Sequence, residues 1–196
     1  MSENMLHAEQ PQSIVKVLET ERTFCRLFTL EDFERLYALH STPEVGSITI
    51  DGIQNETQAL ETLNHFILHQ AQYGYSQWMV YEKASGEFMG RAGFEFRQID
   101  TTIPPQMEIR YAFFPAFWGK GYATELAMAC MQWAFQMVNP EMIVATADPK
   151  NFASHRILEK IGMRYVKDIP YKDVLDVFYT VTRADFHARL GQNAPE

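Results

Sequence analysis

The chain has 196 residues and a formal net charge of −8. A domain of this length buries roughly 70% of the surface that its unfolded chain exposes, so one domain with a good core is expected. The net negative charge argues against a direct nucleic-acid partner and is compatible with a cationic substrate. The sequence has no run of about 18 apolar residues, so a membrane-spanning helix is not expected.

The ends of the chain predict tails around a single domain. Residues 1–12 are polar and lack the charged-then-apolar pattern of a signal peptide. We therefore expect a loose tail over 1–12, one domain over 13–190 and a short tail over 191–196, in a cytoplasmic protein that is a monomer or a homodimer. Cys25 and Cys130 lie in apolar patterns, which predicts buried thiols rather than a disulfide.

The first half of the chain predicts alternating strands and helices. Thr29 and Asp32 stand at the spacing of a capping box, with Asp in place of the usual Glu or Gln, and mark a helix start. Pro43 helps to stop this helix, and Gly46 and Gly52 predict an irregular segment over 45–55. The expected elements are a strand over 23–28, a helix from Thr29 to about 40, a helix over 56–72, and a hairpin of strands over 76–82 and 88–96.

The second half continues the alternation, which indicates an α/β or α+β fold. A strand begins at Glu108 and passes through a glycine turn into a helix that ends near Met137. The remaining expected elements are a strand over 142–147, a helix over 153–160, a closing strand pair over 163–168 and 174–182, and some helical character from Ala184 onward.

The glycine turn, Gly119-Lys120-Gly121, has the features of a phosphate site. A strand leads into it and a helix leaves it, with apolar or small residues at helical spacing from Ala123 to Val138. The first N–H groups of a helix have no partner within the helix, and the helix dipole places partial positive charge there. Glycine lets the main chain approach a ligand closely.

Known phosphate-binding motifs fit this turn poorly. A P-loop requires Ser or Thr after the lysine, where this chain has Gly121. The dinucleotide fingerprint requires a third Gly or Ala at the position of Thr124, and an opening βαβ unit before it. From these residues alone, a helix entry that merely needs glycine stays a possible explanation.

Three segments, however, resemble one family in the right order. Residues 119–125, preceded by Tyr-Ala-Phe-Phe-Pro and Trp118, resemble the pyrophosphate loop of the GCN5-related N-acetyltransferases, with Ala116 replacing the usual Gln or Arg. Residues 151–163 resemble the later N-x-x-S-x-R-x-L-E-K-x-G-F segment of the family. Residues 18–33 are similar to the opening of its ribosomal-protein (RimJ/RimL-like) branch.

The resemblance implies a fold and an activity. The fold would be a mixed, mostly antiparallel central sheet flanked by helices and splayed at the acetyl-CoA site. The activity would be acetyl-CoA-dependent transfer of acetyl to a primary amine by direct attack on the thioester, with a protein or peptide N-terminus as acceptor. A small-molecule amine (a polyamine, an amino sugar or an amino-acid-like metabolite) and a non-catalytic acyl-CoA-binding protein remain alternatives.

The resemblance also implies cofactor contacts. The pyrophosphate would be held by main-chain N–H groups of the glycine turn, and the pantetheine arm would pair with the backbone at the end of the strand before it. On bare sequence grounds the Asn at 151 is a helix cap, and its match to the family motif adds a cofactor contact. The predicted cofactor-binding residues are Phe113, Phe114, Gly119, Lys120, Gly121, Tyr122, Ala123, Thr124 and Asn151.

Two residues are the candidates for catalysis. Many family members place a tyrosine acid where this chain has Leu158, so Ser154 is the candidate that protonates the leaving thiolate; its other explanation is helix capping. Glu108 opens the central strand and is the candidate general base, because burial would raise the pKa of its carboxyl. Its other explanation is a solvated charge at a strand edge.

A metal site is not expected. His65 and His69 stand at i, i+4 on one helix, but no acidic residue occupies the H-E-x-x-H position and no third ligand is evident.

Overall fold

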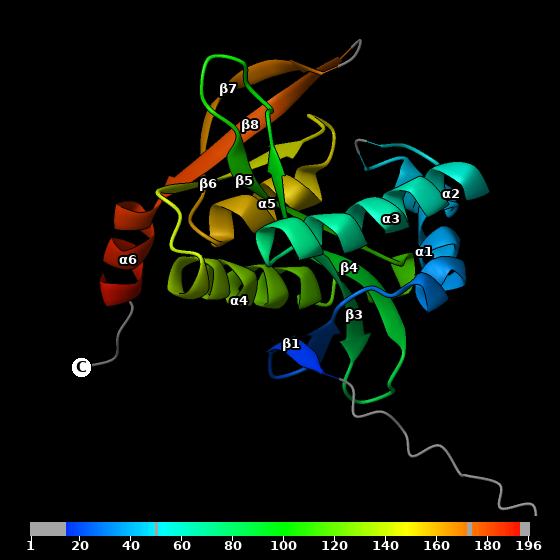
Figure 1. Ribbon diagram of the computed structural model, residues 1–196. Helices are drawn as coiled ribbons and strands as arrows, with labels where there is room; N and C mark the ends of the chain where they lie inside the picture. Colours follow the sequence, from blue (N-terminus) through cyan, green and yellow to red (C-terminus); the bar gives the residue numbers. More distant parts are fainter. Residues whose placement is uncertain (1–14, 50, 172–173, 193–196) are drawn as a thin grey trace, which may run out of the picture.

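The computed structural model describes residues 15–49, 51–171 and 174–192. Eight strands form one sheet in the order β1-β2-β3-β4-β5-β6-β8-β7 (Figure 1). The strands are β1 (Lys16–Glu19), β2 (Thr23–Arg26), β3 (Gln77–Glu82), β4 (Phe88–Arg97), β5 (Gln106–Phe113), β6 (Met142–Ala147), β7 (Arg164–Tyr171) and β8 (Val174–Thr182). Neighbouring strands are antiparallel except β5 and β6, which confirms the predicted mixed, mostly antiparallel sheet.

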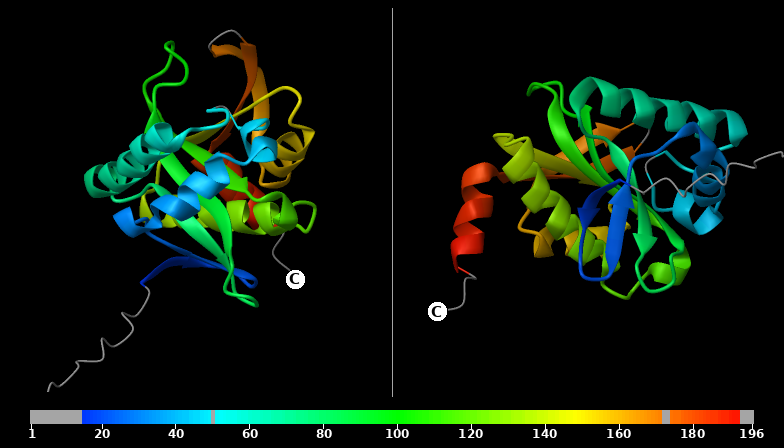
Figure 2. Two further views of the ribbon diagram at one scale, coloured as in Figure 1. Left: turned by 90° about the vertical axis from the view of Figure 1, so that its right-hand side faces the viewer. Right: turned by 60° about the horizontal axis from the view of Figure 1, so that its bottom comes forward.

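Helices cover both faces of the sheet (Figure 2). They are α1 (Phe33–His40), α2 (Pro43–Gly46), α3 (Glu56–Tyr73), α4 (Tyr122–Met137), α5 (Phe152–Lys160) and α6 (Arg183–Gln192), with 3-10 turns at Leu30–Asp32 and Pro115–Phe117. The strand pleat separates the two layers. Trp78 and Val80 of β3 join the main core, which contains the apolar residues of α4, whereas Met79 between them packs with Leu36 of α1 and Phe66 of α3.

The predicted elements are present with end shifts of a few residues, and two short elements were not predicted. β1 has four residues, too few for an alternating pattern, and pairs with β2. α2 occupies part of the segment expected to be irregular, with Pro43 at its first position. The predicted tail over 1–12 and residues 193–196 lie outside the described residues, whereas residues 191–192 belong to α6.

The long helix α3 begins and ends as its sequence dictates. The side chain of Asn55 accepts the N–H of Gln58, and the side chain of Gln58 accepts the N–H of Asn55, at 3.0 Å each. This capping box satisfies N–H groups that the helix itself leaves free. Gly74 ends the helix with a φ of 77°, which glycine adopts without strain.

The sheet opens between β5 and β6. Their parallel pairing is confined to Met107 with Ile143 and Glu108 with Val144. Beyond those pairs, β5 continues to Phe113 beside β4, and β6 continues to Ala147 beside β8. The two halves of the sheet therefore diverge from Glu108 onward, which confirms the predicted splay between the central strand and the next one.

A charged layer lies on the sheet face that α1–α3 cover. Arg110 of β5 contacts Asp51 at 2.7 Å and Glu95 at 3.2 Å, and Arg97 of β4 contacts Glu108 at 2.7 Å. Glu95 and Glu108 are 4% and 1% exposed, so these charges are compensated inside the protein rather than by water.

His40 joins this layer in its neutral form. Its Nδ1 lies 2.7 Å from Gln54 Oε1, and its Nε2 accepts Arg91 Nε–H at 2.9 Å. An Nδ1–H tautomer satisfies both contacts, whereas a charged imidazolium has no lone pair for Arg91. Burial, and then the charge of Arg91, lower the pKa of His40 to about 3.

This pKa shift predicts an acid sensitivity. Between pH 6.5 and 3 the unfolded chain binds a proton at His40 that the folded chain does not, so stability falls as the pH falls through this window. From pH 7.5 to pH 5 the contribution is about 2 kcal/mol. In urea unfolding, His40→Gln, whose amide can replace both contacts, should lose about 2 kcal/mol less than the parent over that interval. Equal losses in the two proteins would contradict the assignment.

Candidate active site

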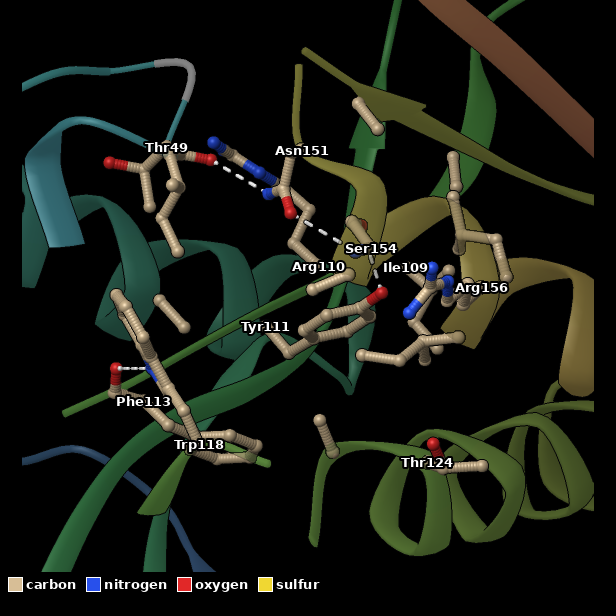
Figure 3. Close-up of a pocket in the computed structure, with 18 of the residues that line it drawn as sticks. Thr49, Ile109, Arg110, Tyr111, Phe113, Trp118, Thr124, Asn151, Ser154 and Arg156 are labelled. Atoms are coloured by element: carbon tan, nitrogen blue, oxygen red, sulfur yellow. Dashed lines mark hydrogen bonds between the residues drawn. The ribbon is translucent and has the colours of Figure 1, made fainter. Parts of the chain in front are cut away.

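A cavity of about 510 Å³ occupies the place where the sheet opens (Figure 3). Both faces of the sheet contribute to it. Ile109, Tyr111 and Phe113 of β5 line it from the α4 side, and Arg110 and Ala112 line it from the α1–α3 side. The remaining lining comes chiefly from the glycine turn, the first turn of α4, the end of β6, the start of α5 and Asp176 of β8.

The glycine turn forms one end of the cavity. Gly119 and Gly121 have φ angles of 72° and 82°, a region that L side chains rarely adopt. Gly121 is the N-cap of α4, so no side chain caps this helix, and the first N–H bonded back to the turn is that of Glu125, 3.1 Å from Gly121 O. The preceding N–H groups of the first turn are therefore available to an anion.

The turn between β1 and β2 holds the glycine turn in place. Arg22 Nε donates to Glu125 at 2.6 Å, its Nη1 donates to the carbonyl of Lys120 at 2.9 Å, and its guanidinium lies 4.3 Å from the centroid of the Tyr122 ring. The main-chain N–H of Arg22 also donates to Glu125 at 3.0 Å. Arg22 therefore contacts the chain both before the start of α4, at Lys120, and within its first turn, at Tyr122 and Glu125.

The predicted pyrophosphate contacts divide into two groups. Gly119, Gly121, Tyr122, Ala123 and Thr124 all line the cavity, whereas Lys120 is exposed and does not. Two cations that the sequence analysis did not select, Arg156 and Lys160 of α5, line it as well. An uncapped helix start with positive-φ glycines, together with two cations, fits a phosphate-bearing ligand such as CoA.

Ser154 lies in the cavity wall and has a partner that the sequence analysis missed. The hydroxyls of Ser154 and Tyr111 are 3.0 Å apart (Figure 3). Burial raises the pKa of Tyr111, so its phenol keeps its proton. Leu158, at the position where many relatives have a tyrosine acid, is 1% exposed and also lines the cavity. A phenol is thus present, but β5 supplies it rather than α5.

Asn151 links the start of α5 to the far side of the cavity. Its Oδ1 accepts Ser154 N–H at 3.0 Å, so the residue caps α5, and its Nδ2 donates to the carbonyl of Ile48 at 3.2 Å (Figure 3). Both Asn151 and Ile48 line the cavity. The cap is observed, and the predicted cofactor contact stays a prediction.

The two phenylalanines at the end of β5 differ in placement. Phe113 lines the cavity, and its carbonyl accepts the indole N–H of Trp118 at 2.7 Å. Phe114 lies outside the lining, packs edge-on against Phe88, and donates its N–H to Met89 O at 2.9 Å. The structure brings Phe113, but not Phe114, to the cavity, and their backbone pairing with a ligand remains a prediction.

Glu108 is placed where the sheet branches. It is 1% exposed, so the explanation as a solvated edge charge is wrong. Its Oε2 accepts from Arg97 at 2.7 Å and its Oε1 accepts from Thr146 at 2.6 Å. Glu108 itself is outside the cavity lining, although Thr146 is in it. Its role as a base is untested by these contacts.

The cavity lining contains four further charged residues that the sequence analysis did not select: Arg91, Arg110, Asp148 and Asp176. Arg110 and Asp176 lie within strands, where a charged residue can face either solvent or a cavity. Only the register of the strands in the sheet could have shown which way these side chains face.

The two histidines of α3 contact other parts of the fold rather than the cavity. His69 contacts Tyr75 O and Phe96 N–H at 2.8 Å each, and His65 lies 3.3 Å from Glu95. Within the described ranges, no three His, Cys, Asp or Glu side chains gather as a metal site, and no helix has the length and apolarity to cross a bilayer.

Comparisons with known proteins agree on the family. A model described as "Acetyltransferase (GNAT) domain" matches residues 22–164. The uncharacterized protein YkkB of Bacillus subtilis is 36% identical over 153 residues, covering 78% of this chain and 87% of YkkB. YnaD of the same organism, an uncharacterized N-acetyltransferase, is 29% identical over 147 residues, covering 75% of this chain and 82% of YnaD.

The fold is also similar to that of solved acetyltransferase structures. The structure of an acetyltransferase from Agrobacterium tumefaciens matches with a TM-score of 0.74 at 24% identity, over 92% of this chain and 99% of that one. The family model spans most of the chain, including the glycine turn, Ser154 and the strands that diverge around the cavity. The chain therefore belongs to the GNAT family of N-acetyltransferases, which use acetyl-CoA as cosubstrate.

Proposed function

We propose that this enzyme acetylates the primary amine at a protein or peptide N-terminus by direct attack of the amine on the thioester. The observation that carries the proposal is a single cavity that contains both the phosphate cradle and the Ser154–Tyr111 pair and reaches through the sheet to its charged face. Solved structures of similar fold include RimL, named a ribosomal L7/L12 alpha-N-protein acetyltransferase, which supports the acceptor class by analogy alone.

A small-molecule amine is the second candidate acceptor. Other neighbours of similar fold are named as a microcin C7 self-immunity acetyltransferase and a nucleotide-linked sugar GNAT, and one sequence relative is named a transacetylase of FsC. A non-catalytic acyl-CoA-binding protein is the third. A screen that reads free CoA release with peptides, spermidine, glucosamine and free amino acids separates the three.

Each proposed role follows from a named group. Acetyl-CoA supplies an activated acetyl thioester. The N–H groups of the first turn of α4 bind its pyrophosphate, and Arg156 and Lys160 add charge. Ser154 donates a hydrogen bond and a proton to the departing sulfur, with Tyr111 restoring that proton. Glu108 stays our sequence-based candidate for the base. The backbone at Phe113 is our candidate for pairing with the pantetheine arm, and Asn151 is our candidate for a further cofactor contact.

The phosphate cradle is tested by Gly121→Glu. The substitution introduces a side chain at a φ of 82° and a negative charge at the helix start, so acetyl-CoA binding should be lost in calorimetry. Gly86→Glu is the matched control, because Gly86 has a φ of 73° in a β3–β4 turn with nothing within 4 Å of an added Cβ. If both variants bind acetyl-CoA like the parent, the cradle is elsewhere.

Ser154 is tested by Ser154→Ala beside Tyr111→Phe. Losing the proton donor should lower kcat by about 10²-fold while the dissociation constant for acetyl-CoA stays nearly unchanged. Tyr111→Phe removes only the hydroxyl and should give a smaller loss in kcat, because Ser154 remains. An unchanged kcat in Ser154→Ala would leave this residue with a structural role at the start of α5.

A further inference from the structure

Asp176 is a buried carboxylate with an oxygen that no described residue contacts through a hydrogen bond. Its side chain is 2% exposed, and among the described residues its Oδ2 has no hydrogen-bond donor and no side chain forms an ion pair with it. The other buried carboxylates all have partners among the same residues. Asp32 binds Arg26 and Thr29, Glu95 binds Arg110, Asp100 binds Lys167 and Thr102, and Glu108 binds Arg97 and Thr146.

The register of β8 aims this carboxylate at the open part of the sheet. Ala147, the last residue of β6, pairs with Val177, so Asp176 stands opposite Asp148 just beyond the end of β6. Residues opposite each other share a face, and Asp176 shares the face of Phe178 and Thr146. Thr146 contacts Glu108, which places Asp176 on the charged face of the sheet, and Asp176 lines the cavity.

The opposite face carries the groups proposed for the leaving sulfur. Tyr111 of β5 and Ser154 of α5 line the same cavity from the side of α4 and α5. A carboxylate on one side of the gap and a hydroxyl pair on the other is the arrangement that an amine acceptor and a thiolate leaving group require.

We propose that Asp176 binds the ammonium group of the acceptor and takes its proton before the amine attacks. This inference deepens the proposed function and rests on it. An ammonium would supply to Asp176 the donor that the described part of the protein does not. A buried polar group left without a partner is destabilising, and it persists where function requires it.

The surroundings of Asp176 suit a base. Burial raises the pKa of this carboxyl most, the nearby charges of Asp148 and Glu108 raise it further, and only Arg97 lowers it. A carboxylate with a raised pKa accepts a proton more readily at neutral pH than an ordinary aspartate does. Asp148 also lines the cavity, so a second carboxylate faces a cationic acceptor there.

The proton balance closes. The ammonium R–NH₃⁺ gives one proton to the Asp176 carboxylate and becomes R–NH₂, whose lone pair forms the C–N bond to the acetyl carbon. When the tetrahedral intermediate collapses, the C–S bond breaks, its electron pair goes to the CoA sulfur, and Ser154 gives that sulfur a proton. The nitrogen loses its second proton to water, and one proton from water replaces the one that the Ser154–Tyr111 pair has given up. The products are the acetamide and CoA–SH, and Asp176 returns its proton to solvent.

The test compares three variants with the parent enzyme, using the peptide or amine that the screen selects. Asp176→Asn should lower kcat/KM for the acceptor at least tenfold at neutral pH, abolish the acidic limb of its pH profile, and leave acetyl-CoA affinity unchanged. Asp168→Asn is the matched control: Asp168 is exposed on the neighbouring strand β7, outside the cavity lining, and should behave like the parent.

Glu108→Gln decides between the two carboxylates. If Asp176→Asn keeps the rate and the acidic limb, or if Glu108→Gln alone removes that limb, the inference about Asp176 is wrong. If the parent releases no CoA with any amine, the proposed function fails instead. In that case Asp176 is still tested by calorimetry, in which spermidine and a serine-initiated tetrapeptide are titrated into the CoA-bound parent and the CoA-bound Asp176→Asn variant. The variant should bind these ammonium compounds at least tenfold more weakly than the parent. Equal binding to the two proteins would overturn the inference.

Discussion

The whole site depends on where β5 and β6 stop pairing. Their last paired residues are Glu108 and Val144, and Glu108 ties the branch point together because Arg97 of β4 and Thr146 of β6 each bind one of its oxygens. Glu108 is buried, so removal of Arg97 would leave its charge uncompensated inside the protein. A branch fixed in this way gives the cavity a defined position between two otherwise continuous half-sheets.

The gap joins two chemically different faces. On the α4 side the sheet packs through apolar residues such as Ile109, Ala145 and Tyr179, which hold the helix start and α5 rigidly beside the gap. On the α1–α3 side the sheet carries arginines and carboxylates. The proposed phosphate cradle lies beside the first face, and the proposed acceptor site lies beside the second. The proposed acetyl transfer would take place in the gap between them.

The sequence predicted what local patterns encode. The strand, glycine turn and helix from Glu108 to Met137 follow from hydrophobic periodicity and helix-start chemistry, and α3 follows from apolar residues at helical spacing. The splay itself came from resemblance to a family, because no local pattern states which neighbouring strands will fail to pair. β1 was missed, since four residues are too few to establish a period.

The partners of the site residues could not be predicted, because they come from segments distant in the chain. Tyr111 meets Ser154, and Asn151 meets Ile48, only after the sheet and its loops are assembled. The same holds for the carboxylates. In sequence, Glu108 and Asp176 are both single acids within strands. In the fold, Glu108 has both oxygens occupied, and Asp176 has an unpartnered oxygen among the described residues. A satisfied buried charge stabilises a particular geometry, whereas an unsatisfied one is retained against its desolvation penalty, and the difference appears only in three dimensions.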